Sequence, residues 1–175
     1  MPRPLTPLLQ ASPAAAPWGL AAPPARRQPA RKATPPGPPG AAPAGSALRV
    51  LYVDDNAINT MLMAAMFERL PGLDLRCTSS PHQCLALAVA DPPALLLVDI
   101  QMPGMDGYQL LAQLRADPAT RAVPAIAVSA NAMPQDVARG HAAGFADYLT
   151  KPLDLHRLQQ ALQAALPGWV APPLP

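Results

Sequence analysis

The chain has few of the residues that form disulfides or hold transition metals. Its 175 residues include only two cysteines, Cys77 and Cys84, which are seven positions apart and form no Cys-x-x-Cys motif. The three histidines, His82, His141 and His156, lack the spacing of zinc ligands. We therefore predict neither a disulfide framework nor a zinc site, and this cysteine usage is typical of a reducing cytosol.

Long apolar runs are also missing. A membrane-spanning helix needs about 18 consecutive apolar residues, and no run in this sequence approaches that length. Prolines interrupt each short apolar run near the N-terminus, which argues against a targeting segment. We therefore predict a cytoplasmic protein without a membrane span.

The first 47 residues contain no acidic side chain and hold 13 of the 26 prolines. Five basic residues give this segment a charge of +5, so the rest of the chain carries −3 of the overall +2. A segment rich in proline and alanine cannot bury enough apolar surface to offset its ordering entropy, and we predict a disordered tail over residues 1–47. Its charges are too sparse to favour the alternative, a basic arm that binds nucleic acid or an anionic membrane.

Strand-like and helix-like segments alternate after the tail. Strands are predicted at 48–53, 73–78, 94–98, 123–128 and 146–149, and helices at 58–70, 81–90, 106–116, 134–143 and 154–166. The apolar runs lack polar alternation, which indicates strands covered on both faces. Right-handed crossovers favour a flavodoxin-like, doubly wound (βα)5 α/β fold with a five-stranded parallel sheet in the order 2-1-3-4-5. This domain occupies residues 48–166, and a proline-rich end follows at 167–175.

Three of the predicted helices have features of their own. Asp106 is a candidate N-cap for helix 106–116. Gly140 lies inside helix 134–143, where it costs up to about 1 kcal/mol relative to alanine, so we expect this helix to be soft. Helix 58–70 has apolar residues at helical spacing, and we interpret its methionines as packing residues. The residues at helical spacing are Ile58, Leu62, Ala65, Met66 and Leu70, and the methionines are Met61, Met63 and Met66.

Polar residues stand where four of the predicted strands end. Asp54 and Asp55 follow the first strand, Asp99 the third, Ser129 the fourth, and Lys151 comes just after the fifth. The carboxyl ends of parallel strands lie at one edge of a sheet. We therefore predict that three carboxylates, one hydroxyl and one ammonium group share a crevice.

This set of groups has a definite chemistry. Clustered carboxylates disfavour each other's ionisation unless a cation is present, and oxygen ligands point to Mg²⁺. A carboxylate, a hard dication and a lysine are the groups that phosphoryl transfer needs. In this interpretation Asp99 attacks in line, Lys151 neutralises charge on the phosphoryl oxygens and Ser129 donates a hydrogen bond to them. The product is an aspartyl phosphate.

Each residue also has a simpler interpretation. Asp54, Asp55 and Asp106 stand where helix caps are common, Ser129 could be a loop hydroxyl and Lys151 could be solvated. These interpretations explain the residues one by one. They do not explain why all four strand ends carry the groups of a single mechanism.

Residues 48–166 resemble the receiver domain of two-component response regulators. The resemblance is carried by residues 53–56, 97–107, 128–130 and 148–152. It implies that Asp99 is the phosphoacceptor, that Asp55 binds Mg²⁺ directly and that Asp54 binds it through water. It further implies that the backbone carbonyl of Gln101 completes the metal ligands and that Lys151 pairs with the phosphoryl group.

The resemblance also implies roles for residues around the acidic site. Ser129 is the switch hydroxyl and Tyr148 the switch aromatic. The side chains of Gln101 and Asn131 tune how long the phosphoryl group survives. The peptide bond before Pro152 is expected to be cis, which is uncommon for X-Pro bonds. Residues 56–59 and 129–134 are most similar to receivers of hybrid sensor histidine kinases.

The implied partners are a sensor histidine kinase or a histidine phosphotransfer protein. A further, unknown protein would contact the face formed by helix 134–143, strand 146–149 and helix 154–166. No kinase core precedes residue 48 and no output domain follows residue 166, so we expect a stand-alone receiver or one separated from a hybrid kinase.

Two alternatives belong to other classes. A Mg²⁺-dependent phosphatase of the haloacid dehalogenase type also uses an aspartate at a strand end, but it needs a second aspartate two residues on, where this chain has Gln101. A phosphorylation-independent adaptor would act through the tail or through the face formed by helix 134–143, strand 146–149 and helix 154–166. We expect a signalling phosphoacceptor that catalyses only its own phosphorylation and dephosphorylation, rather than an enzyme.

Overall fold

The computed structural model describes residues 47–131 and 133–173, so the predicted disordered tail lies, apart from Ala47, outside the described residues. The described part alternates strands and helices from one end to the other. The elements are β1 (Leu48–Val53), α1 (Ala57–Phe67), β2 (Leu73–Thr78), α2 (Pro81–Ala90), β3 (Leu95–Asp99), α3 (Gly107–Ala116), β4 (Ala125–Ser129), α4 (Pro134–Ala143), β5 (Asp147–Thr150) and α5 (Leu155–Ala165).

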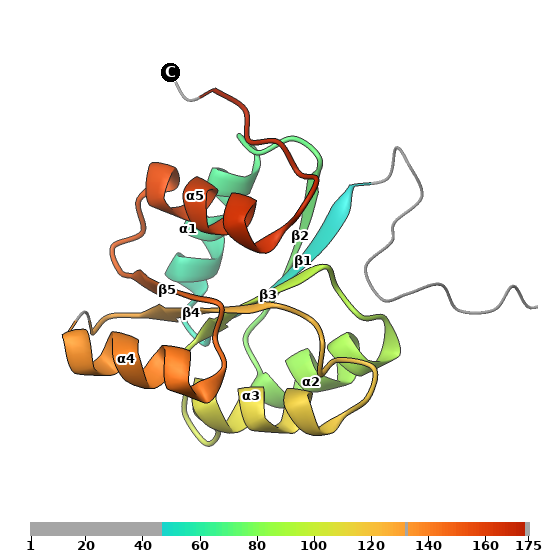
Figure 1. Cartoon of the computed structure of the whole chain (residues 1–175), viewed down its shortest axis with the longest axis vertical. Helices are drawn as coiled ribbons and strands as arrows, with labels where there is room; N and C mark the ends of the chain where they lie inside the picture. The colour runs from blue at the N-terminus through green and yellow to red at the C-terminus, as the bar shows by residue number, and fades with distance from the viewer. Residues whose placement is uncertain (1–46, 132, 174–175) are drawn as a thin grey trace, which may run out of the picture. The chain divides into compact units, whose positions relative to one another are not determined.

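The five strands form one parallel sheet in the order β2-β1-β3-β4-β5, which confirms the predicted topology. Helices α1 and α5 cover one face of this sheet, and α2, α3 and α4 cover the other (Figure 1). The register pairs Val53 with Val98, and Asp99 with Val128. The ends of β1, β3 and β4 are therefore nearly level, which brings their polar residues to the same edge.

The alternation of side chains along each strand produces two apolar cores. In β1, Leu51 and Val53 face the core under α2, α3 and α4, whereas Val50 and Tyr52 face the core under α1 and α5. All five residues of β3 are buried. The central strands are thus held on both sides, which fixes the residues at their ends.

Side chains cap the starts of four helices. Asn56 caps α1, Ser80 caps α2 and Asp154 caps α5. Asp106 caps α3 and forms a capping box with Gln109, which confirms the sequence-based assignment. The first helix is capped by the residue after the Asp54-Asp55 pair, so the simpler interpretation of these two aspartates as caps is wrong.

The C-terminal end of α1 differs from the prediction. The helix ends at Phe67 rather than at Leu70. The N–H of Arg69 donates to the carbonyl of Met66 at 3.1 Å and that of Leu70 to the carbonyl of Phe67 at 2.9 Å, so the residues after Phe67 form a tighter turn instead of another α-helical one. Pro71 disfavours helical geometry at Leu70, and Gly72 adopts a φ of +83° that leads the chain into β2.

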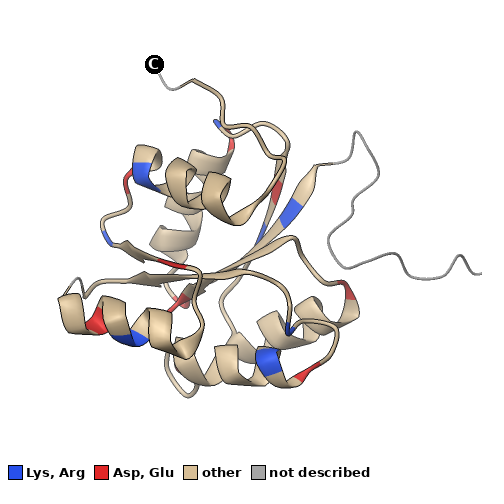
Figure 2. Ribbon diagram, viewed as in Figure 1, with Lys and Arg blue, Asp and Glu red and all other residues tan. Residues whose placement is uncertain are grey.

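The buried face of α1 also differs from the prediction. Met63 and Phe67 are buried, whereas Ile58 is 74% exposed, Met61 71% and Leu62 44%. The interpretation of Met61 as a packing residue is therefore wrong. Helix α1 contains no charged residue and is drawn in tan in Figure 2. Because the helix is apolar nearly all round, its sequence has no polar stripe to show which side faces the core.

Two strands on the β4 side of the sheet are shifted from their predicted bounds. Strand β4 begins at Ala125 rather than at residue 123, because Pro124 has no N–H to donate and only its carbonyl joins the sheet, accepting from Leu96 at 2.9 Å. Strand β5 runs from Asp147 to Thr150, one residue later than predicted. Both shifts leave the order of strand-end residues unchanged.

The amino end of the sheet is closed by residues that follow α5. Trp169 is buried, and its Nε1 donates to the carbonyl of Pro71 at 3.0 Å. The amide of Gln159 donates to the carbonyl of Pro172. The proline-rich end thus packs against the domain.

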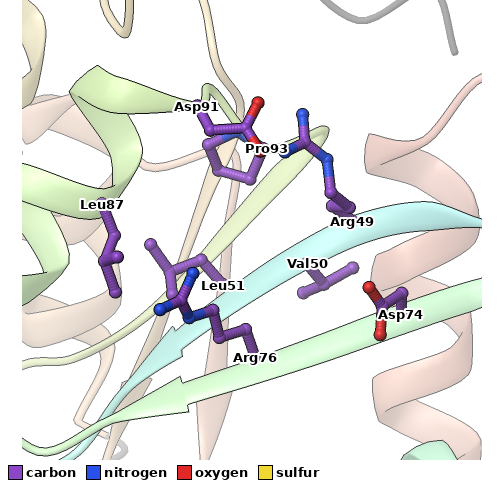
Figure 3. Close-up of a pocket in the computed structure, with 8 residues that line it drawn as sticks. All are labelled: Arg49, Val50, Leu51, Asp74, Arg76, Leu87, Asp91 and Pro93. Carbon is purple, nitrogen blue, oxygen red and sulfur yellow. Dashed lines mark ion pairs between the residues drawn. The ribbon is translucent and has the colours of Figure 1, made fainter. Parts of the chain in front are cut away.

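On the other face of the sheet, a small hollow at the start of β1 is lined in part by Arg49 and Asp91, which form an ion pair (Figure 3).

Candidate phosphoryl-transfer site

The carboxyl edge of the sheet gathers the three predicted carboxylates. One oxygen from each of Asp54, Asp55 and Asp99 lies within 4.8 Å of the others. Asp54 and Asp99 are buried, whereas Asp55 is exposed. The crevice is therefore closed at its floor and open to solvent at Asp55.

Lys151 reaches this cluster from the segment after β5. Its Nζ lies 2.7 Å from Oδ2 of Asp54 and 3.1 Å from Oδ1 of Asp99. The Lys151–Pro152 peptide bond is cis, the geometry that the resemblance implies. The backbone N–H of Lys151 donates to the carbonyl of Ser129 at 2.7 Å. Lys151 is thus held beside the acids by both its backbone and its ammonium group.

The carboxylate of Asp54 accepts hydrogen bonds from several directions besides Lys151. Tyr52 Oη donates to Oδ2 at 2.5 Å, the N–H of Asn56 to Oδ1 at 2.9 Å, and Nδ2 of Asn59 to both oxygens at 3.1 and 3.0 Å. Burial opposes ionisation of Asp54, but the hydrogen bonds from Lys151 and these neighbours outweigh it, so the pKa of Asp54 is lowered. Asp54 is therefore fixed in position and held as a carboxylate.

Sequence reasoning missed Tyr52 and Asn59. Tyr52 stands two positions before Asp54 on a strand, so both side chains point to the same face of the sheet. Asn59 lies at the start of α1, less than one turn after the cap Asn56. Both spacings were visible in the sequence, but a buried tyrosine is an ordinary core residue unless its hydroxyl is known to reach an acid.

Asp99 is in a different electrostatic situation from Asp54. Burial raises its pKa, the ammonium group of Lys151 opposes this, and the charge of Asp54 adds to the rise, so that the pKa of Asp99 is raised overall. The N–H of Gln101 donates to Oδ1 of Asp99 at 3.3 Å. Asp99 thus has fewer donors than Asp54 and is the less stabilised carboxylate of the pair.

The predicted site residues on β4 and β5 differ in their surroundings. Ser129 is buried, and its Oγ accepts a hydrogen bond from the N–H of Asn131 at 3.1 Å. The side chain of Asn131 is exposed at the rim, as is that of Gln101. Tyr148 is 6% exposed and lies in the core under α2, α3 and α4. The ring of Tyr148 is thus part of this apolar core.

The donor atoms fit a hard divalent cation. The three carboxylates offer oxygen only, and one of them is open to solvent, as Mg²⁺ requires because it keeps several water ligands. Soft metals would require thiolate or imidazole ligands. The site therefore fits Mg²⁺ by its charge, its ligand atoms and its accessibility.

The parallel sheet in the order 2-1-3-4-5, with two acids after β1, one after β3 and a lysine after β5, defines a receiver domain. The comparison with protein families agrees, because the model described as "Response regulator receiver domain" matches residues 50–163. The chain belongs to this family and therefore to two-component signalling. The phosphatase alternative has no support in this match.

Two relatives show how the domain is used elsewhere. The signal transduction histidine-protein kinase BarA of Shigella flexneri is 38% identical over 122 residues, which are 70% of this chain but 13% of BarA. Protein PilH of Pseudomonas aeruginosa is 36% identical over 120 residues, 69% of this chain and 98% of PilH. The chain therefore spans a small part of one relative and almost all of the other.

A solved structure is similar in both sequence and fold. It is the receiver domain of the sensor histidine kinase PA1611 from Pseudomonas aeruginosa PAO1, with 32% identity and a TM-score of 0.63, covering 69% of this chain and 98% of that one. That structure has a magnesium ion coordinated in its active-site cleft.

In the described part of the present chain, no helix has both the length and the apolar character needed to cross a bilayer.

Proposed function

We propose that this chain is the phosphoacceptor of a two-component or phosphorelay system and that Asp99 accepts a phosphoryl group from a phosphohistidine. The observation that carries this proposal is the position of Lys151, whose Nζ lies 2.7 Å from Asp54 and 3.1 Å from Asp99 in a crevice with a third acid. A lysine in this position is able to leave the acids and pair with a transferred phosphoryl group.

The transfer itself is a simple displacement. One carboxylate oxygen of Asp99 forms a bond to phosphorus while the phosphorus–nitrogen bond of the donor breaks, and the electron pair of that bond stays on the imidazole nitrogen. Lys151 opposes the effect of burial on Asp99 and so favours its ionised, nucleophilic form. Lys151 then pairs with the phosphoryl oxygens, and Asp54 keeps its bonds to Tyr52 and Asn59.

Mg²⁺ would be held by Asp55, Asp54, Asp99 and the backbone carbonyl of Gln101. When bound, it supplies positive charge that stabilises the developing charge on the phosphoryl oxygens. The rigid hold of Tyr52 and Asn59 on Asp54 supports this assignment, because it fixes one ligand before the ion arrives. The chain in this proposal catalyses only its own phosphorylation and dephosphorylation.

The response to phosphorylation involves Ser129 and Tyr148. Ser129 Oγ accepts a hydrogen bond from the N–H of Asn131, and its hydroxyl proton is donated to the phosphoryl group once Asp99 is phosphorylated. Tyr148 follows this change at the face formed by α4, β5 and α5. Gln101 and Asn131 expose their side chains at the rim and govern access of water to the aspartyl phosphate. A downstream protein recognises the α4–β5–α5 face.

The phosphodonor is a sensor histidine kinase or a histidine phosphotransfer protein, which places the chain in the cytoplasm. The phosphodonor docks on the uncharged outer face of α1 of this chain, where Ile58, Met61 and Leu62 are exposed. Leu62 and Lys151 line the same surface hollow, so a partner on α1 reaches the reactive crevice. Exposed apolar side chains of this kind favour a protein partner over a small donor.

Intact mass after incubation with acetyl phosphate or a phosphorylated kinase and Mg²⁺ tests the proposed function. The chain should gain one phosphate, which is labile to base, and Asp99→Asn should gain none. Asp117→Asn, which lies at the end of α3, is a matched control that should still gain it. If wild-type chain gains no phosphate from any donor, the proposed function is wrong.

A further inference from the structure

The ring of Tyr148 packs against α4 at Gly140, which has no side chain. A Cβ atom placed on Gly140 would lie 2.7 Å from Cδ2 and 3.1 Å from Cε2 of this ring. Carbon atoms in favourable contact are about 3.5–4.0 Å apart. Even one methyl group at position 140 is therefore incompatible with the present position of the ring.

The backbone of Tyr148 is fixed and cannot retreat from such a group. Tyr148 pairs with Ala127 in the sheet, and its N–H donates to Oδ1 of Asp147 at 2.7 Å. The same oxygen accepts from Arg157 of α5 at 2.7 Å. Strand β5 is thus tied to β4 on one side and to α5 beyond it.

The end of α4 is fixed as well. The N–H of Phe145 donates to the carbonyl of Gly140 at 3.2 Å, and the N–H of Gly144 donates to that of His141 at 3.0 Å. Gly144 has a φ of +101°, and this pair of bonds is the Schellman motif that ends many helices. Because the turn from α4 into β5 is closed by these bonds, Gly140 cannot slide along Tyr148.

Two further aromatic residues pack in the same apolar core as Tyr148. The rings of Tyr108 and Phe145 meet edge to face with their centroids 5.9 Å apart, and the guanidinium of Arg139 lies 4.2 Å from the centroid of Tyr108. Tyr148 and Phe145 share one apolar core, against which Tyr108 packs. The ring of Tyr148 therefore fits between α3 and α4 because residue 140 has no side chain.

We propose that Gly140 is a positioning residue for Tyr148: its missing side chain forms the recess that holds the ring buried, so the size of residue 140 sets the balance between a buried and an exposed ring. The link to signalling rests on the function proposed above, in which Tyr148 is part of the switch. A larger residue at 140 releases the ring toward the surface formed by α4, β5 and α5. Glycine destabilises the interior of α4 relative to alanine, but its lack of a side chain leaves the room that the ring needs.

The first test follows the ring in the full chain labelled with 3-fluorotyrosine. Its three tyrosines give three fluorine signals, assigned by Tyr→Phe variants. In Gly140→Ala the Tyr148 signal should show a larger shift between H₂O and D₂O, as an exposed ring does, and the Tyr52 signal should not change. Ala142→Gly, an exposed position of the same helix, is the control and should leave the Tyr148 signal unchanged. An unchanged Tyr148 signal in Gly140→Ala would overturn the proposal.

The second test is a double-mutant cycle of urea unfolding midpoints. Gly140→Ala should lower the midpoint when Tyr148 is present and raise it in a Tyr148→Leu background, because only the better helix propensity of alanine then remains. If Gly140→Ala alone does not fold, the double variant should still fold. A midpoint that moves the same way in both backgrounds, or a double variant that does not fold, would overturn the proposal.

Both tests are made without a phosphoryl donor. A failure of the intact-mass experiment would therefore overturn the proposed function and leave the relation between Gly140 and Tyr148 standing. A failure of the two tests above would do the reverse.

Discussion

The two ends of the parallel sheet differ in whether their charged side chains are buried or exposed. At the carboxyl end, Asp54 and Asp99 are buried with Lys151 between them. At the amino end, the ion pair of Arg49 and Asp91 stands in solvent, with side chains 46% and 69% exposed. Buried charges lose their hydration, whereas exposed pairs keep it and contribute little. The carboxyl end thus holds its charged side chains inside the domain, whereas the amino end keeps them at the surface.

Trp169 is buried at the amino end of the sheet, and its removal should have the largest effect on stability among these predictions. Trp169→Ala empties a buried site and deletes the hydrogen bond to Pro71, so we expect a loss of about 3–5 kcal/mol in the free energy of unfolding. Urea unfolding followed by circular dichroism measures this loss. Phosphate uptake should be unaffected wherever the variant is folded, because Trp169 lies at the opposite end of the sheet from Asp99.

The next residue, Val170, provides the matched control for Trp169. Its side chain is 80% exposed, and Val170→Ala should change the free energy of unfolding by less than about 0.5 kcal/mol. A loss below about 1 kcal/mol for Trp169→Ala would show that the segment after α5 is not part of the domain's core.

Tyr52→Phe tests the structural support of the carboxyl end. The substitution keeps the buried ring and removes the hydroxyl that donates to Asp54 at 2.5 Å. Hydrogen bonds to charged groups contribute about 1.5–3 kcal/mol, so we expect a loss of that order in urea unfolding. Tyr108→Phe, on the other face of the sheet, should change stability by less than about 0.5 kcal/mol. Equal stability of Tyr52→Phe and the wild type would mean that Lys151, Asn59 and the N–H of Asn56 hold Asp54 without the tyrosine hydroxyl.

The prediction with the smallest effect concerns pH and the pair of Asp147 and Arg157. Burial opposes ionisation of Asp147, but hydrogen bonds from Arg157 and the Tyr148 N–H outweigh it and lower its pKa. Because the pKa is lower in the folded chain than in the unfolded one, this group adds stability above its ordinary pKa, which is lost as pH falls. For a half-exposed pair the gain is about 0.2–1 kcal/mol.

Unfolding midpoints between about pH 3 and pH 7 measure this contribution. Asp147→Asn should make the midpoint less dependent on pH over that range, and Arg157→Gln should do so as well, because it removes the stronger donor. An unchanged pH dependence in Asp147→Asn would assign the acid sensitivity to other carboxylates.

The sequence predicted the order of the strands and the meeting of Asp54, Asp99, Ser129 and Lys151 at one edge. The strand order was predicted from the alternation of strands and helices and from the preference for right-handed crossovers. The strand-end residues follow from the apolar runs and from the residues that directly succeed them, which are local signals. The edge of a parallel sheet then turns local signals into a shared site.

Other features depend on packing that no local pattern records. The apolar stripe of α1 through Ile58 and Leu62 is exposed, because a helix without charged residues offers two equivalent stripes. The hold of Tyr52 on Asp54 and the burial of Trp169 need knowledge of what lies across the fold. The recess at Gly140 likewise exists only because Tyr148 lies on a neighbouring strand.

In the function proposed above, the buried carboxylate of Asp99 is retained for reaction, and we expect it to lower the stability of the folded chain. Asp99→Asn tests it, because Asn is the same size, still accepts from the N–H of Gln101 and leaves Lys151 paired with Asp54. The raised pKa of Asp99 means that its carboxylate is less favourable in the folded chain than in the unfolded one. The decisive measurement is the urea unfolding midpoint of Asp99→Asn at pH 7. We predict a midpoint higher than that of the wild type. A lower midpoint would mean that the carboxylate of Asp99 stabilises the fold.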